Sequence, residues 1–410
     1  MKRANTILAA AFLLVLCAMA GYTLSDFDTI RATIVNAWHT RADQSDDSLL
    51  SRLEFAAGRT EGALNAALDR EHWFIELYGG VQRLTGQKFV EDSYSYCVIR
   101  MKNGALTFGS IGQEQKDVSH NARATAGFAA KLGEKGIPFS AVMPPQKVPD
   151  MFAYPPLVPY ALQDYHNQEA DQFLSVLSEQ GIHTVDLRKG YGDYHGVVFV
   201  GDSNDFFRTD HHWTAHGAFK GNQAMTAALS DQYGFDIFQP GVDGSQFYHT
   251  IYKDLFLGSQ GKRVGTLYAG VDDFVLYHPK FDTSMTYTIH DSGHTRSGTL
   301  EEALYFEEHL VRDYYNANPY VTFVGGDWGK ATVTNHLNPG GPKVVMIRDS
   351  FACAITPFFA LQCSELTTID LRAYQGEDLL ADIEGMEPDF VVLFYSPSTT
   401  VSDNMFEFSK

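Results

Sequence analysis

Short apolar runs alternate with helix-favouring segments in two stretches of this 410-residue chain. The first stretch predicts a helix, a strand, a helix and a strand over 118–132, 138–143, 162–179 and 182–187. The second predicts strands, separated by helices, over 344–347, 366–370 and 390–394. Strands that alternate with helices form parallel sheets with helices on both faces. The chain is therefore predicted to be an α/β protein.

The segments outside these two stretches have other patterns. Over 240–320, short aromatic and β-branched runs are broken by Gly and Asp, which indicates a β-rich insertion. Residues 25–90 favour helix and predict a helical stalk or N-terminal cap. The predicted α/β domain would then comprise 91–239 and 321–410. Within it, Asn103-Gly104 lies between two apolar runs and predicts a tight hairpin.

Residues 1–24 have the features of a signal peptide or membrane anchor. Lys2 and Arg3 precede an apolar run, and Ala18-Met19-Ala20 has the small-x-small form that signal peptidases accept. Cleavage after Ala20 would give a secreted or periplasmic protein. Without cleavage, the 18 residues from Ile7 to Leu24 would form a tilted anchor, with the rest of the chain outside the cytoplasm.

The charge balance argues against one large class of partners. With 31 Lys and Arg against 50 Asp and Glu, the formal net charge is −19 at pH 7. Nucleic-acid binding draws most of its affinity from basic residues that displace counterions, and the sequence has no basic stripe. We therefore expect no nucleic-acid partner.

A candidate nucleophile follows the strand at 344–347. The chain runs through Arg348 and Asp349 into Ser350, where a sharp turn would expose Oγ at the carboxyl edge of the sheet. If a helix begins directly after Ser350, its backbone N–H groups would point at an oxyanion. Thr356-Pro357, however, has the pattern of an N-cap followed by proline, which predicts that the continuous helix begins there. A serine that only closes a turn is the alternative interpretation.

A candidate base lies in Thr209-Asp210-His211-His212-Trp213-Thr214. Residues two apart share a face of an extended segment, so Asp210 is expected beside His212 while His211 points away. A carboxylate that orients an imidazole, whose other nitrogen takes a serine proton, is the arrangement of a Ser-His-Asp triad. A surface loop without a catalytic role is one alternative. A zinc site at His212 and His216 is another, although the Glu of His-Glu-x-x-His is absent. We predict no metal and no cofactor.

These motifs together resemble a known family. Asp210-His211-His212-Trp213-Thr214 is followed about 130 residues later by Arg348-Asp349-Ser350-Phe351, and then by Ile369-Asp370-Leu371-Arg372. The combination resembles the DHHW branch of the SGNH hydrolase superfamily, which is similar to the SGNH-like proteins of alginate O-acetylation. The resemblance implies a flavodoxin-like SGNH sheet. It also implies that Ser350 is the nucleophile, His212 the general base and Asp210 its orienting acid.

The resemblance extends to candidates for oxyanion and substrate binding. Gly326 and the Ser350 amide would be oxyanion donors. The family tends to have Gly-Gly-Asn where this chain has Gly325-Gly326-Asp327, and a carboxylate cannot donate unless it is protonated. Arg348 and Trp213 are further candidates. Trp213 would either line a sugar-binding groove beside His212 or pack the loop.

A second serine competes for the role of nucleophile. Gly201-Asp202-Ser203-Asn204 follows an apolar run and spells the Gly-Asp-Ser block of ordinary SGNH hydrolases. The segment between Ser203 and Asp210 does not have the pattern of the helix that should follow a nucleophile turn. We therefore favour Ser350.

The predicted function is acyl-ester chemistry on a carbohydrate. The resemblance implies an O-acetyltransferase or acetylesterase that acts on an envelope or secreted polysaccharide through an acyl-serine, with a membrane-bound O-acyltransferase as a partner that supplies acetyl groups. The alternative is a non-catalytic polysaccharide-binding subunit of an acetylation or export complex, because Asp327 departs from the family pattern.

Overall fold

The computed structural model describes residues 72–91, 96–101, 103–111, 114–147, 162–191 and 205–408, and a few single positions between 13 and 59. The chain divides into two compact units, 1–81 and 82–410. Of the predicted signal or anchor, only Leu13, Cys17 and Gly21 are described, so this prediction lies outside the described residues. No helix in the described ranges is both long enough and apolar enough to cross a membrane.

Little of the predicted stalk is described. Scattered helical positions between 27 and 59 and helix α4 (Trp73–Leu84) fall within it. The boundary between the two units, after Val81, lies nine residues before the predicted one.

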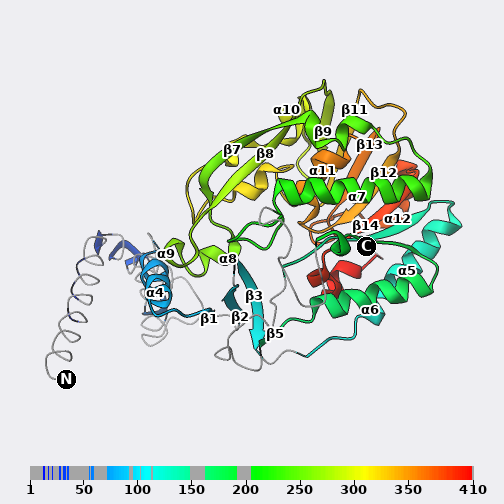
Figure 1. The fold of residues 1–410 in the computed structure, drawn as a ribbon. Coiled ribbons are helices and arrows are strands. Elements are labelled where there is room, and N and C mark those ends of the chain that lie inside the picture. Colours follow the sequence, from blue (N-terminus) through cyan, green and yellow to red (C-terminus); the bar gives the residue numbers. More distant parts are fainter. Residues whose placement is uncertain are drawn as a thin grey trace. The chain divides into compact units, whose positions relative to one another are not determined.

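An eight-stranded sheet forms the centre of the second unit (Figure 1), in the order β10-β9-β11-β13-β12-β14-β4-β6. Neighbouring strands from β13 to β6 are parallel, whereas β10, β9, β11 and β13 are joined antiparallel. The strands are β4 (Phe139–Met143), β6 (His183–Asp186), β9 (Met285–Ile289), β10 (His294–Gly298), β11 (Lys330–Asn335), β12 (Lys343–Arg348), β13 (Glu365–Ile369) and β14 (Phe390–Phe394).

Helices cover both faces of this sheet. On β12, Val344 and Met346 face one apolar core, and Val345 and Ile347 face the other. This burial on both sides explains why the strand is continuously apolar instead of alternating with polar residues. The first core includes α7 (Ala215–Tyr233) and α11 (Ala352–Phe359), and the second includes α5 (Ser119–Glu134), α6 (His166–Glu179) and α12 (Leu379–Met386). The predicted α/β class with helices on both faces is confirmed, but the sheet is only mostly parallel, because β10, β9, β11 and β13 are joined antiparallel.

The predicted β-rich insertion is only partly separate from this sheet. Strands β9 and β10 come from it and extend the main sheet, while β7 (Phe247–Phe256) and β8 (Asp272–Pro279) form a two-stranded ribbon. Its short helices are α8 (Ser259–Lys262), α9 (Thr266–Ala269) and α10 (Leu300–Leu304).

A separate four-stranded sheet takes three strands from the segment before the α/β core and one from the segment between β4 and α6. It consists of β1 (Phe89–Glu91), β2 (Tyr96–Arg100), β3 (Leu106–Ile111) and β5 (Leu162–Gln163). The turn at Asn103-Gly104 joins β2 to β3 as an antiparallel pair, and Gly104 has a positive φ of 85°. The predicted hairpin is therefore present.

The helix after the candidate nucleophile begins earlier than Thr356-Pro357 predicts. Helix α11 starts at Ala352 and contains Pro357 in its interior. Thr356 does not cap it, because its Oγ1 donates to the Ala352 carbonyl, 2.8 Å away within the same helix. That prediction is wrong. The early start leaves Ser350 two residues before the helix.

Candidate active site

Two segments meet at the carboxyl edge of the parallel strands. The turn after β12 carries Ser350, and the loop before α7 carries Asp210 and His212. Ser350 Oγ lies 2.8 Å from His212 Nε2, and His212 Nδ1 lies 2.6 Å from Asp210 Oδ1. The structure therefore brings the three predicted catalytic residues together as a hydrogen-bonded chain of carboxylate, imidazole and hydroxyl.

Asp210 is buried, and both of its oxygens are hydrogen-bonded. Oδ1 also accepts the backbone N–H of His212 at 3.0 Å, and Oδ2 accepts the backbone N–H of Ser259 at 2.6 Å. Burial disfavours the charge, but the imidazoles of His211 and His212 and the Ser259 N–H hold the pKa of Asp210 well below its usual value. The ionised carboxylate can thus fix the proton of His212 on Nδ1 and leave Nε2 free to accept.

A second buried carboxylate shapes the same loop. Asp272 accepts the backbone N–H groups of Arg208 at 3.0 Å and Thr209 at 2.8 Å, and the Thr209 hydroxyl at 2.6 Å. The Thr209 Oγ1 in turn accepts the N–H of Gly258 at 2.9 Å. Asp272 therefore fixes the backbone directly before Asp210. No sequence motif identified this role.

Lys147 also holds the loop before Asp210 in place. Its Nζ donates to the Phe207 carbonyl at 2.8 Å and to Gln260 Oε1 at 2.9 Å, and the side chain is buried. Burial lowers the pKa of Lys147 to about 7, although the carboxylates of Asp210 and Asp272 oppose this shift. A buried ammonium thus lies beneath the loop that carries the candidate base.

His211 does not point away from the site, contrary to prediction. Its ring lies beside that of His212 with centroids 3.8 Å apart, and its Nδ1 is 2.9 Å from Ser259 Oγ. The prediction assumed an extended backbone, but Asp210 Oδ1 accepts the His212 N–H and bends the chain. Burial and the neighbouring His212 lower the pKa of His211 to about 3, so it is neutral at physiological pH.

Two aromatic side chains pack around the triad. Tyr320 stacks on His212, with centroids 3.9 Å apart, and its hydroxyl donates to the Ser350 carbonyl at 3.1 Å. Trp213 has no exposed surface, and its Nε1 donates to the Phe351 carbonyl at 2.9 Å. Of the two roles considered for Trp213, the structure supports the second, because its side chain packs the loop against the nucleophile turn. Tyr320 comes from an irregular segment that the motifs did not identify.

Arg348 is also buried and holds the turn that contains Gly326 and Asp327. Its Nη2 donates to the Gly326 carbonyl at 3.1 Å, and its Nη1 pairs with Asp327 and with Asp370, the latter at 3.4 Å. Burial disfavours a charge on Asp327, but Arg348 and Arg372 hold its pKa below the usual value. The Asp327 carboxylate is therefore ionised and does not donate to an oxyanion.

The amides near Ser350 decide which group can bind an oxyanion. The Gly326 N–H donates to the Phe323 carbonyl at 3.2 Å, so it is engaged within its own turn. The Ser350 N–H has no hydrogen-bond partner among the residues that the structure describes. Of the two predicted donors, the structure therefore leaves the Ser350 amide available.

Asp349 shapes the nucleophile turn, a role that the motifs did not reveal. Its Oδ1 accepts the Phe351 N–H at 3.0 Å. Its Oδ2 accepts the N–H and the hydroxyl of Ser396, both at 2.7 Å, and the hydroxyl of Thr399 at 2.7 Å. Asp349 therefore ties the turn after β12 to the loop after β14.

The two alternative sites are a zinc site at His212 and His216 and a nucleophile at Ser203. His216 Nδ1 lies 2.9 Å from the Tyr277 hydroxyl, and His212 Nε2 faces Ser350, so the two are not arranged as a ligand pair. Within the described ranges, the group of three side chains with metal-ligating atoms within 4.8 Å of one another is Asp210, His211 and His212. Asp210 Oδ1 and His212 Nδ1 are hydrogen-bonded at 2.6 Å, which leaves no space for a cation between them. Ser203 lies outside the described residues.

Two family models match this chain. Residues 110–250 match the SGNH hydrolase-like domain of the acetyltransferase AlgX, and residues 197–367 match the DHHW proteins. The second match contains Asp210, His212 and Ser350. No protein with a curated function matches the sequence.

Solved structures share the fold at low sequence identity. Bacillus cereus PatB1 aligns with a TM-score of 0.62 at 21% identity, over 76% of this chain and 99% of PatB1. PatB1 with a sulfonyl adduct aligns with a TM-score of 0.59 at 20% identity, over 77% and 98% of the two chains. A DHHW family protein from Eubacterium siraeum aligns with a TM-score of 0.53 at 18% identity, over 77% and 95%. The resemblance that the motifs suggested is thus confirmed: parts of the chain match the DHHW model and the model of the SGNH hydrolase-like domain of AlgX.

Proposed function

We propose that this protein is an extracytoplasmic serine enzyme that transfers acetyl groups to, or removes them from, an envelope or secreted polysaccharide. The observation that carries the proposal is the chain of hydrogen bonds from Asp210 through His212 to Ser350, 2.6 and 2.8 Å long. The match to an acetyltransferase domain and the sulfonyl adduct of PatB1 support the same chemistry.

The first half of the proposed reaction forms an acyl-enzyme. Ser350 Oγ attacks the acetyl carbonyl while His212 Nε2 takes its proton, and ionised Asp210 stabilises the resulting imidazolium through Nδ1–H. The carbonyl oxygen becomes an oxyanion that the Ser350 N–H binds. Collapse of this intermediate releases the donor alcohol, which takes the proton back from His212.

The second half repeats these steps with a new nucleophile. His212 removes the proton of a sugar hydroxyl, which attacks the acyl-serine and carries the acetyl group away, and Ser350 Oγ recovers a proton. Water in place of the sugar gives hydrolysis. In the transferase direction, a membrane-bound O-acyltransferase would supply the acetyl groups. Residues 7–24 would hold the protein at the outer face of the cytoplasmic membrane.

A non-catalytic polysaccharide-binding subunit is the second candidate. The ionised Asp327 and the engaged Gly326 amide favour it, because together they leave one oxyanion donor near Ser350 among the described residues. A hydrogen bond from one oxyanion donor is typically worth about 3–4 kcal/mol of transition-state stabilisation, so its loss lowers the rate without removing the nucleophile.

Covalent labelling separates the two candidates. The protein is incubated with phenylmethanesulfonyl fluoride, and the intact mass and the modified peptide are measured. An enzyme should gain one sulfonyl group on Ser350, at a rate that His212→Ala lowers by about a thousandfold. A protein that binds sugar without catalysis should remain unmodified at Ser350.

Turnover tests the direction of the reaction. The protein is incubated with 4-nitrophenyl acetate, with and without a panel of oligosaccharides, and the products are identified by mass spectrometry. Acetylated sugar indicates transfer, and free acetate alone indicates hydrolysis. Loss of both with Ser350→Ala is expected, and the Ser350→Ala/His212→Ala double variant should be hardly worse because the pair acts as a unit.

A further inference from the structure

A second Asp-x-His pair repeats the local geometry of the first. Asp164 Oδ1 accepts the backbone N–H of His166 at 3.0 Å and lies 2.8 Å from His166 Nδ1. The corresponding distances between Asp210 and His212 are 3.0 and 2.6 Å. In both pairs one carboxylate oxygen fixes the backbone and the imidazole together. Neither motif analysis nor the proposed reaction uses the second pair.

Gln146 lies between this second pair and the loop beside the nucleophile turn. Gln146 Nε2 lies 3.3 Å from His166 Nδ1, and Gln146 Oε1 accepts the Ser398 N–H at 2.7 Å. Ser398 lies in the loop that Asp349 ties to the turn before Ser350. Because Gln146 follows β4 and Ser398 follows β14, both pairs lie at the carboxyl edge of the same sheet.

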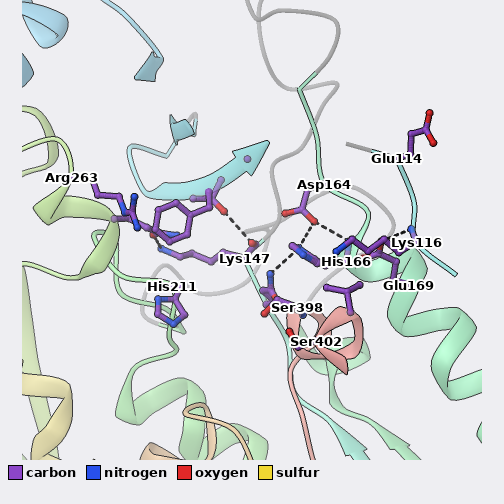
Figure 2. A pocket seen from close by; sticks show the side chains of 16 residues that line it. Glu114, Lys116, Lys147, Asp164, His166, Glu169, His211, Arg263, Ser398 and Ser402 are labelled. Atoms are coloured by element: carbon purple, nitrogen blue, oxygen red, sulfur yellow. Dashed lines mark hydrogen bonds and ion pairs between the residues drawn. The ribbon is translucent and has the colours of Figure 1, made fainter. Parts of the chain in front are cut away.

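A pocket of about 530 Å³ is lined by Asp164 and His166 of the second pair and by His211, the neighbour of His212. Figure 2 shows His211 and Lys147 on one side of it, and Asp164 and His166 on another. Since the His211 ring lies 3.8 Å from that of His212, the pocket reaches the edge of the proposed triad. This volume is within the usual range of ligand sites.

His166 offers a hydrogen-bond donor to this pocket. Burial disfavours its charge, but Asp164, by its charge and its hydrogen bond, and the nearby Glu169 raise the pKa of His166 above its ordinary value. The imidazolium therefore persists to higher pH than in a free histidine. Its Nδ1–H is held by Asp164, and its Nε2 has no partner among the described residues.

We propose that this pocket binds the sugar that accepts the acyl group and that His166, held by Asp164, donates from Nε2 to one of the sugar's oxygens. The inference rests on the proposed acyl transfer and names its acceptor site. His166 is then a residue that determines acceptor binding, while His212 carries out the proton transfer.

The composition of the pocket favours a polyhydroxylated, largely uncharged ligand. Its formal charges balance, with three carboxylates against three cations other than histidine: Glu114, Asp164 and Glu169 against Lys116, Lys147 and Arg263. Hydroxyls of Thr107, Ser398 and Ser402 provide further donors and acceptors. Phe108 adds an aromatic face, over which the Arg263 guanidinium lies 5.2 Å from the ring centre. Closely spaced donors and acceptors with an aromatic face suit a sugar better than a polyanion.

Binding is tested in the Ser350→Ala full-length chain, which cannot turn the sugar over. The probes are cellotriose, chitotriose and a hyaluronan tetrasaccharide, which are neutral, N-acetylated and acidic, respectively, and binding is measured by calorimetry and saturation-transfer NMR. At least one neutral probe is expected to bind, and His166→Ala should weaken it tenfold or more. Unchanged affinity in His166→Ala overturns the proposal.

The matched control is another His–carboxylate pair outside the pocket. His120 Nε2 lies 3.0 Å from Asp403 Oδ1, and both side chains are exposed. His120→Ala should leave the affinity unchanged. Thermal melting of each variant shows that it is folded.

A pH series separates donation from a merely structural role. Because the pKa of His166 is raised by Asp164, the donor is present below this pKa, and the affinity should fall as the pH rises through it. Lys116, which lowers this pKa, and Glu114, Lys147, His211 and Arg263 also face the pocket, and Lys147 titrates near pH 7. His166→Gln keeps an amide donor that does not titrate, so the pH step should disappear. Asp164→Asn should move the step to lower pH, and a step that is the same in all three proteins would refute the donor role.

The outcomes distinguish this inference from the proposed function. Sulfonylation of Ser350 in a protein that binds none of the three probes refutes the sugar pocket and leaves the serine chemistry intact. Binding that depends on His166, in a protein whose Ser350 is never sulfonylated, supports the sugar pocket and refutes the acyl chemistry.

Discussion

The ring of Tyr320 lies face to face with the imidazole of His212, with centroids 3.9 Å apart and planes 13° apart. The same tyrosine donates its hydroxyl to the Ser350 carbonyl at 3.1 Å. One side chain thus contacts both the proposed base and the backbone of the proposed nucleophile.

Substitutions at Tyr320 should separate these two contacts. Tyr320→Phe keeps the stacked ring and loses one hydrogen bond, so kcat for 4-nitrophenyl acetate should fall less than about tenfold. Tyr320→Leu removes the ring and frees the imidazole to move, so kcat should fall by roughly 10- to 100-fold. A Leu variant with wild-type kcat would show that the stacking is incidental.

Gly258 leaves no space for a side chain next to the proposed acid. A Cβ at this position would lie 2.2 Å from Asp210 Cβ and 2.6 Å from Asp210 Cα. Gly258→Ala should therefore displace Asp210 and reduce kcat by about a hundredfold, as measured with the same ester.

Gly127 in α5 provides the matched control. A Cβ there meets nothing within 4 Å. Gly127→Ala should keep full activity and stabilise the exposed helix by about 0.5–1 kcal/mol, as measured by urea unfolding. Equal activities of the two alanine variants would contradict the steric argument.

Arg348 should contribute to stability because it neutralises buried carboxylates. Arg348→Met leaves Asp370, which is fully buried, with the partly exposed Arg372 as its remaining cation. Breaking a buried pair in this way costs about 3–5 kcal/mol, so the urea midpoint should drop sharply. Lys135 and Glu384 form an exposed ion pair 2.9 Å apart. Lys135→Met should leave the midpoint unchanged, and similar midpoints for the two variants would argue against the buried network.

Lys147 should make stability depend on alkaline pH. Its pKa is about 7 in the folded protein and 10.5 in its ordinary state, so the unfolded chain binds the extra proton between these values. The free energy of unfolding should then rise with pH from about 7 to 10.5, by up to ~1.4 kcal/mol per unit. The measurement compares urea unfolding of the wild-type and Lys147→Met proteins across this range. The contribution of Lys147 is the difference between the two slopes, and parallel curves would assign the lysine an ordinary pKa.

The parts of this protein that follow a regular period could be predicted from sequence. Strand β14 has the predicted bounds 390–394, and α5, α6 and β12 differ from theirs by a few residues. Burial on both faces makes these strands continuously apolar. Amphipathic helices can be recognised because their apolar residues recur three and four positions apart. The same reasoning could not place β9 and β10, because a short antiparallel strand pairs equally well with the main sheet or with a separate one.

The site was predictable where chemistry requires residue types at a fixed spacing. Asp-x-His supplies a carboxylate and a base from one loop, and Ser350 follows a buried strand. Asp272 and Ser259 are the first residues of β8 and α8, and Tyr320 lies in a single 3-10 turn, so no repeating period indicates which of these side chains turns inward. The predicted orientation of His211 was wrong for another reason. The His212 N–H donates to the Asp210 side chain, and this hydrogen bond bends the backbone that the spacing argument assumed to be extended.

The position of β14 in the sheet determines the order in which the strands can pair during folding. Strands β4 and β6 reach β12 only through β14, since β14 lies between β12 and β4 in the sheet. A chain made from its amino end therefore presents β4 and β6 some 200 residues before the strand that joins them to the rest. Until then, the edge of β4 that β14 will cover is unpaired, and unpaired strand edges of this kind promote aggregation. The two Asp-x-His pairs are likewise brought to one edge only when the last strand is inserted.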